Sequence, residues 1–159
     1  MCSSDLLRDQ WTAQQDRTAR LLDALASIDE VFRRERIEYL VLKGLPMAER
    51  FHGGADRRFT WDLDLLVREA DVAHARHALG TLGIHGPALT AGLDRIAMRV
   101  AHAIECRRED GLSLDLHWAF RRLPGLRFPA EDVFHQGVLR ELDGDRKSTR
   151  ELQSPCNLV

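Results

Sequence analysis

Two carboxylates separated by a single residue, Asp62 and Asp64, stand in residues 60–67, a stretch that alternates before it ends in an apolar run. Alternate residues of a β-strand point to the same side, so both carboxylates share one face while Leu63 and Leu65 pack on the other. In a partly buried site such a pair stays ionised only if a cation compensates, and hard oxygen ligands favour Mg2+ or Mn2+. The pair therefore predicts a divalent-metal site.

A third carboxylate, Asp115, alternates with leucines in residues 112–118 and is therefore predicted on the polar face of another strand. Three carboxylates from two strands suit two-metal nucleotidyl transfer, in which one metal activates the attacking hydroxyl and the other holds the triphosphate and the leaving pyrophosphate. We predict Asp62, Asp64 and Asp115 as the metal-binding and catalytic residues, with Asp115 serving the activating metal.

A nucleotide site also needs donors for the phosphate groups. Gly44, at a predicted turn between a strand and a short helix, lets backbone amides approach an anion, helped by the positive end of that helix. Lys43 and Arg58 add positive charge, and His117 shares a strand face with Asp115. We predict these four as nucleotide-binding residues. The alternatives are that Lys43 only snorkels at a strand end, that Gly44 only permits the turn, that Arg58 is a surface charge or a structural partner of Asp62, and that His117 anchors the sheet through hydrogen bonds.

Other side chains with possible chemistry are assigned to structure. Trp61 and Trp118 could stack on a base, but large aromatic side chains beside strands more often fill the core, so we assign both to packing. His74 and His77 lie three residues apart on a predicted helix without the cysteine or acidic partners of a zinc site. We expect them on a solvated helix face.

Periodicity indicates the elements that must position these residues. Apolar residues recur at helical spacing over residues 11–34 and 69–82, and Gly83 is expected to end the second helix in the left-handed conformation. Strands are predicted over residues 37–42 and 60–67. The glycine turn at residues 43–44 and a short helix beginning near Pro46 are predicted to connect them.

A hairpin is predicted between residues 98–107 and residues 112–118. In the first of these stretches His102 falls on the apolar side of the alternation. A two-residue turn at 110–111 would put the Cys106 face on the same side as Asp115 and mix apolar with charged groups. A three-residue loop at 109–111 instead sets Glu105 and Arg107 beside Asp115, and Ile104 and Cys106 with Leu114 and Leu116. We prefer the second register.

The C-terminal part carries weaker signals. A loop is expected around Pro124 and Pro129, followed by a short helix through Val133, Val138 and Leu142. Residues 146–159 have no periodicity and look like translated adaptor sequence. We therefore predict one domain over residues 1–145, continuing in the natural protein beyond this point, and a non-native tail over residues 146–159.

Composition excludes several classes of protein. The 159 residues carry a formal net charge of −2, which gives no strong signal for nucleic acid. There are three cysteines without a Cys-x-x-Cys pair, no basic and apolar leader at the N-terminus, and no apolar stretch long enough to cross a bilayer. We expect a cytoplasmic protein with no membrane partner.

The chain resembles the uncharacterised bacterial nucleotidyltransferase family of the polymerase-beta-like superfamily over about residues 37–120. Three segments carry the resemblance: Val41-Leu42-Lys43-Gly44, Arg58 followed by Asp62-Leu63-Asp64-Leu65-Leu66-Val67, and Asp115-Leu116-His117-Trp118. The resemblance implies an α/β (α+β) fold with a mixed β-sheet flanked by helices. It also implies metal roles for the three aspartates, and a match between Gly44 and the family's glycine turn.

These observations predict an enzyme that moves a nucleoside monophosphate from a nucleoside triphosphate, with ATP as one candidate, to a hydroxyl group. The acceptor is a small molecule or a protein, and the cofactor is Mg2+ or Mn2+. One alternative is a catalytically inactive module that binds nucleotide or a partner on the same fold. The other is an antitoxin-like nucleotidyltransferase that modifies a protein.

Overall fold

The computed structural model describes residues 3–45, 60–88, 101–123, 126–129, 134, 137–140 and 149–152. Its two α-helices and a single 3-10 turn are α1 (Ser3–Arg34), η2 (Glu69–Asp71) and α3 (Val72–Gly80). Its strands are β1 (Tyr39–Val41), β2 (Leu63–Val67), β3 (Ala103–Arg107), β4 (Ser113–His117), β5 (Ala119–Leu123), β6 (Leu126–Pro129), β7 (Gly137–Arg140) and β8 (Thr149–Leu152).

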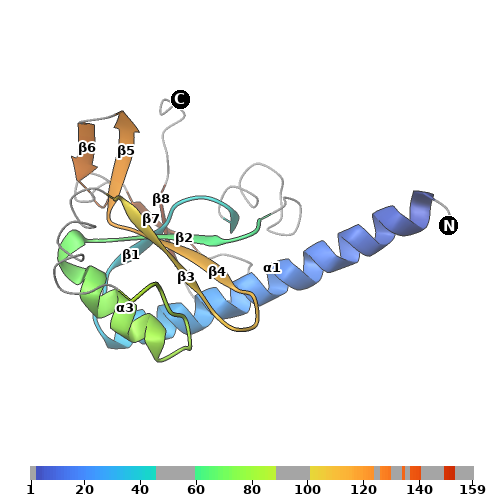
Figure 1. Ribbon diagram of the computed structural model, residues 1–159, viewed down its shortest axis with the longest axis horizontal. Helices are drawn as coiled ribbons and strands as arrows, with labels where there is room; N and C mark the ends of the chain where they lie inside the picture. Colours follow the sequence, from blue (N-terminus) through green and yellow to red (C-terminus); the bar gives the residue numbers. More distant parts are fainter. Residues whose placement is uncertain are drawn as a thin grey trace.

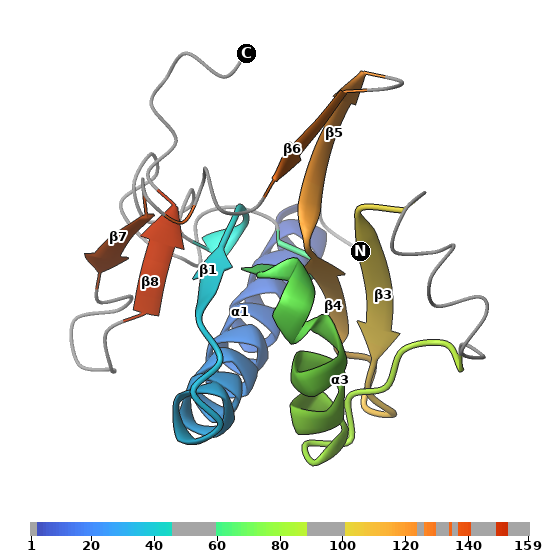
Figure 2. The same cartoon turned by 90° about the vertical axis from the view of Figure 1, so that its left-hand side faces the viewer.

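The strands form one mixed sheet with the order β3-β4-β2-β1-β8-β7, and β5 pairs with β6 in a separate hairpin (Figure 2). At the centre, β2 runs parallel to β4 and antiparallel to β1. Because a parallel pair needs a long crossover, the chain leaves β2, forms α3 and β3, and returns as β4. The predicted mixed sheet with helices against it is confirmed.

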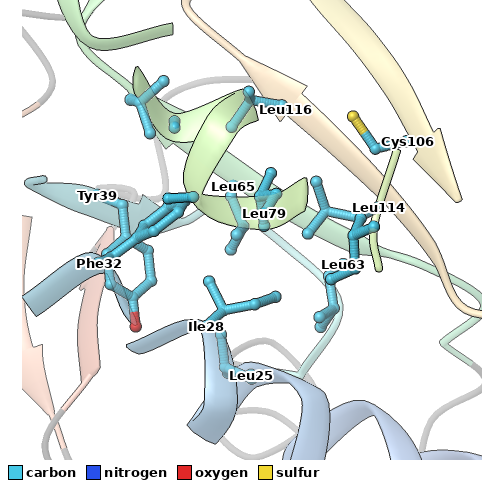
Figure 3. Close-up of a cluster of buried hydrophobic side chains, with 14 of the residues drawn as sticks. Leu25, Ile28, Phe32, Tyr39, Leu63, Leu65, Leu79, Cys106, Leu114 and Leu116 are labelled. Carbon is cyan, nitrogen blue, oxygen red and sulfur yellow. The ribbon is translucent and has the colours of Figure 1, made fainter. Parts of the chain in front are cut away.

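Helices α1 and α3 lie side by side against one face of this sheet (Figures 1 and 2). Buried side chains of both helices meet the inward residues of the strands, among them Leu63 and Leu65 of β2 and Leu114 and Leu116 of β4 (Figure 3). The opposite face carries a smaller buried cluster of Leu40, Leu66 and Phe134. Period-two alternation thus divides each central strand between a helix-covered face and a second face.

The first turns of α1 extend past the sheet (Figure 1). The sequence predicts a helix only from residue 11, whereas α1 begins at Ser3. Residues 8–13 are exposed, and the side chain of Trp11 is 50% exposed. Apolar periodicity records packing against a core, so it misses helical turns that do not pack on one.

The predicted β3–β4 hairpin is confirmed in its register. Glu105 is paired with Asp115 and Cys106 with Leu114, and the Arg108 amide donates to the Leu112 carbonyl at 3.0 Å. The loop therefore has three residues, 109–111, and Gly111 has the positive φ of 87° that the preferred register requires. Gly83, after α3, likewise has the expected positive φ, of 72°.

The predicted loop and helix of the C-terminal part are wrong at the residues that the structure describes. Val138 lies in β7, antiparallel to β8, and not in a helix, and Pro129 ends β6 rather than lying in a loop. Such short strands are decided by partners distant in sequence, which local spacing does not contain. Val133 and Leu142 lie outside the described residues. Strand β8 falls within residues 146–159 and runs parallel to β1, and the domain boundary at residue 145 stays a prediction.

Candidate active site

The parallel pairing of β2 and β4 aligns two acidic side chains. Asp64 is the register partner of Asp115, and Leu66 is the partner of His117. The neighbours of the two aspartates in sequence, leucines 63, 65, 114 and 116, are buried under the helices. Alternation therefore turns Asp64, Asp115 and His117 toward the face opposite α1 and α3.

The three side chains form a set suited to a metal ion. One ligand atom from each of Asp64, Asp115 and His117 lies within 4.8 Å of the others. The Asp64 side chain is 1% exposed, and its Oδ2 atom is buried without a hydrogen-bond partner among the described residues. An ionised oxygen in that position costs free energy unless a cation or donor satisfies it. Two carboxylates and an imidazole fit a divalent cation.

The other oxygen of Asp64 has two partners. Lys43 Nζ lies 2.9 Å from Oδ1, and His117 Nε2 lies 3.1 Å from the same atom. Burial opposes ionisation of Asp64, but these two hydrogen bonds and the charges of their donors outweigh it, so the pKa of Asp64 is lowered. Asp64 is therefore ionised at neutral pH, with Oδ1 bonded to Lys43 and His117 and with Oδ2 buried and without a partner among the described residues.

The pKa of Asp115 shifts in the opposite direction to that of Asp64. Partial burial, followed by the neighbouring charge of Asp64 and a smaller contribution from Asp62, raises the pKa of Asp115. Two carboxylates that share a site repel each other, and the second ionisation is the costly one. A cation in this site would remove that cost.

We expect Asp115→Asn to raise the midpoint of thermal unfolding of the metal-free protein by a few degrees at neutral pH. The folded pKa of Asp115 lies above its unfolded value, so ionised Asp115 destabilises the fold at high pH, and this cost disappears as pH falls through the raised pKa. The advantage of the variant should shrink over the same range. A variant less stable than wild type at neutral pH would contradict this sign.

Asp62 is not one of the three clustered residues Asp64, Asp115 and His117. Its side chain is half-buried, and β2 begins only at Leu63, so the alternation that predicts a shared face with Asp64 does not extend back to it. Asp62 still acts on the site through its charge, which contributes to the raised pKa values of Lys43 and Asp115. Its role as a metal ligand stays a prediction.

Gly44 forms the turn after β1 in a conformation that favours glycine. Its φ is +79°, and a Cβ atom there would lie 2.8 Å from the Thr60 Cγ2 atom. The Leu42 amide donates to the Asp64 carbonyl at 3.0 Å, which fixes the end of this segment beside β2. The predicted short helix after Pro46 and the candidate Arg58 lie outside the described residues, so an anion site there stays a prediction.

Gly44→Ala should lower the free energy of unfolding by about 1–2 kcal/mol from the left-handed backbone alone, and by more from the close contact with Thr60. Urea denaturation measures the loss. The companion variant Gly44→Ala with Thr60→Ser removes Cγ2, and should recover the contact part of the loss but not the backbone part. If Gly44→Ala were as stable as wild type, this turn would not need glycine.

Two aromatic side chains given the same assignment differ in the structure. Trp118 is 3% exposed in the main core, so its assignment to packing is confirmed. For Trp61 the assignment is wrong, because its side chain is 61% exposed and the Arg17 guanidinium carbon lies 4.1 Å from the ring centroid. His74 is confirmed on the surface, where it contacts Glu35 at 3.2 Å.

One site neighbour was missed by the sequence reasoning. His102 is exposed, and its ring centroid lies 6.0 Å from that of His117, although the alternation placed His102 on the apolar side. Strand β3 begins only at Ala103, and the His102 carbonyl accepts a hydrogen bond from the Trp118 amide. The polarity of histidine within an otherwise apolar series was the available signal.

Carboxylates on adjacent parallel strands of a mixed sheet, beside a glycine turn that follows a third strand, are the arrangement expected of a nucleotidyltransferase. The family model described as "uncharacterised nucleotidyltransferase" matches residues 4–156, and the chain belongs to this family. The resemblance seen in the sequence and the assignment to an enzyme class are confirmed.

Solved structures agree on the fold. Seven chains match, among them the crystal structure of the lincosamide antibiotic adenylyltransferase LnuA with lincomycin bound. The match has a TM-score of 0.56 and 13% sequence identity, and covers 82% of this chain and 78% of the other. The comparison with curated proteins finds no match. Among the described residues, no helix is long and apolar enough to cross a membrane.

Proposed function

We propose that the protein transfers a nucleoside monophosphate from a nucleoside triphosphate to a hydroxyl group in a reaction that depends on a divalent cation. The observation that carries this proposal is the buried Oδ2 atom of Asp64, which lies beside Asp115 and His117 and has no hydrogen-bond partner in the described part of the chain. A family of nucleotidyltransferases supplies the reaction class, and this oxygen supplies a specific reason for a cation.

Asp64 and Asp115 would hold the cation, with His117 either as a third ligand or as the group that orients Asp64, and with Asp62 as a further predicted ligand. Carboxylate oxygens favour Mg2+, and the imidazole makes Mn2+ equally suitable. When bound, the cation supplies positive charge for the triphosphate and for the attacking oxygen.

The chain's own residues account for the remaining requirements of the transfer. Lys43, the backbone at Gly44, and Arg58 bind the triphosphate and align its α-phosphorus. The acceptor oxygen forms a bond to this phosphorus, the bond from phosphorus to the oxygen bridging the β-phosphate breaks, and pyrophosphate leaves. The hydroxyl proton passes to a carboxylate oxygen of the cluster, and Asp115 is the candidate because it lies beside Asp64.

A small molecule is the acceptor we favour, because the adenylyltransferase of similar fold is described with an antibiotic bound. ATP is the first donor to test for the same reason, and a hydroxyl group on a protein is the second acceptor class.

A cytoplasmic location is part of the proposal. Cys106 is buried as a free thiol, and burial raises its pKa to about 11, which suits a packing role in a reducing compartment.

The experiment incubates the protein with each nucleoside triphosphate labelled at the α-phosphate, Mg2+, and either the small-molecule or the protein fraction of a cell extract. Label transferred to one fraction, with release of pyrophosphate, identifies the donor and the acceptor class. Omission of the divalent cation is the control and should abolish transfer. Triphosphate binding without pyrophosphate release in any fraction would instead identify a nucleotide-binding module.

A further inference from the structure

Lys43 and Asp64 form an ion pair whose two members differ sharply in exposure. The Lys43 side chain is 54% exposed, whereas that of Asp64 is 1% exposed, and Nζ and Oδ1 lie 2.9 Å apart. Strand β1 ends at Val41, and Leu42 and Lys43 follow it. The Leu42 amide donates a hydrogen bond to the Asp64 carbonyl. The backbone of Lys43 is therefore fixed beside the site, while its ammonium group reaches in from solvent.

In the absence of a metal ion, this ammonium group supplies positive charge that a cation would otherwise supply. Burial disfavours the charged form of Lys43, but its hydrogen bond to Asp64 and the charges of Asp64, Asp62 and Asp115 together raise its pKa. Lys43 thus interacts with all three aspartates predicted to hold the metal. Lys43 compensates the negative charge of the cluster but leaves Asp64 Oδ2 without a hydrogen-bond partner among the residues that the structure describes.

We propose that Lys43 is an exchangeable counter-ion, which neutralises Asp64 when no cation is bound and moves to the triphosphate when a divalent cation binds. The inference rests on the proposed function, because it needs both ligands to occupy this site. In this proposal the Lys43 side chain links the binding of the divalent cation to the binding of the triphosphate.

The exchange follows from charge and from exposure. An ammonium group and a divalent cation on one carboxylate repel each other at short range, so cation binding weakens the hold of Asp64 on Lys43. The half-exposed lysine stem can turn without loss of core packing. A triphosphate then offers the released ammonium new anionic partners. Metal and nucleotide should therefore bind with positive coupling that depends on Lys43.

The first arm of the test measures Mn2+ binding in the absence of nucleotide by isothermal titration calorimetry. Lys43→Gln removes the competing charge, and we expect it to bind Mn2+ roughly three- to tenfold more tightly than wild type. Lys43→Arg keeps the charge and should remain within about twofold of wild type on the same scale. Arg34→Gln is the control, because it removes one exposed positive charge that pairs with Glu35.

The second arm measures binding of α,β-methylene ATP at saturating Mn2+, where Lys43→Gln should bind roughly tenfold more weakly than wild type. Opposite signs in the two arms support the exchange, since a purely structural role would weaken both ligands. Equal or weaker Mn2+ binding by Lys43→Gln, with wild type binding normally, would overturn the exchange alone. No Mn2+ binding by either protein would overturn the proposed metal site as well.

Discussion

Asp64→Asn is expected to abolish measurable Mn2+ binding and to lower kcat/KM for nucleotidyl transfer by about 10^3-fold or more, because a bound metal stabilises the transition state by several kcal/mol. Asp64 is the most buried member of the cluster, and its Oδ2 atom has no hydrogen-bond partner among the described residues. An amide in its place removes the negative charge while preserving the shape. Transfer of an α-phosphate label and calorimetry with Mn2+ measure the two losses.

Glu105→Gln is the matched control for this variant. Glu105 is paired with Asp115 across β3 and β4, its side chain is 51% exposed, and it lies outside the cluster. The Glu105→Gln substitution therefore removes one negative charge next to the site without removing a ligand. It should change kcat/KM by less than about threefold, as expected of an exposed charge. If both variants lost activity equally, general charge rather than coordination by Asp64 would explain the effect.

The part of the site that lies on strands could be predicted from the sequence. Alternation alone places Asp64 opposite Leu63 and Leu65, and Asp115 and His117 opposite the leucines of β4. The register of the β3–β4 hairpin was also predictable, because loop length and the need to keep charged and apolar faces apart allow only one choice. These are local properties, in which neighbouring residues contain the necessary information.

What could not be predicted depends on contacts distant in sequence. The alignment of Asp64 with Asp115 joins strands about fifty residues apart, and no local pattern contains that register. The exposure of Trp61 arises because β2 begins only at Leu63, a boundary that alternation places several residues too early. The Lys43–Asp64 ion pair likewise depends on how β1 meets β2.

Leu65→Ala should lower the free energy of unfolding by about 2–5 kcal/mol, the usual cost of emptying a fully buried leucine site. Leu65 is 0% exposed and packs in the core between β2 and the two helices (Figure 3). Chemical denaturation measures the loss. Because the side chain points away from Asp64, the Mn2+ affinity of the folded variant should stay within about twofold of wild type, as for any core change that leaves the ligands in place.

Comparing Leu66→Ala with Leu65→Ala tests whether packing on the two faces of β2 affects metal binding differently. Leu66 is the same residue type, is also 0% exposed and lies one position further along the strand, but it packs with Leu40 and Phe134 on the face that carries Asp64. Its register partner is His117, which contacts Asp64. Both alanine variants should lose stability, but only Leu66→Ala should also weaken Mn2+ binding, because the cavity it leaves lies beside groups that orient the carboxylate. Equal Mn2+ affinities in the two variants would mean that the packing beneath the site does not hold Asp64 in place, and that its hydrogen bonds to Lys43 and His117 suffice.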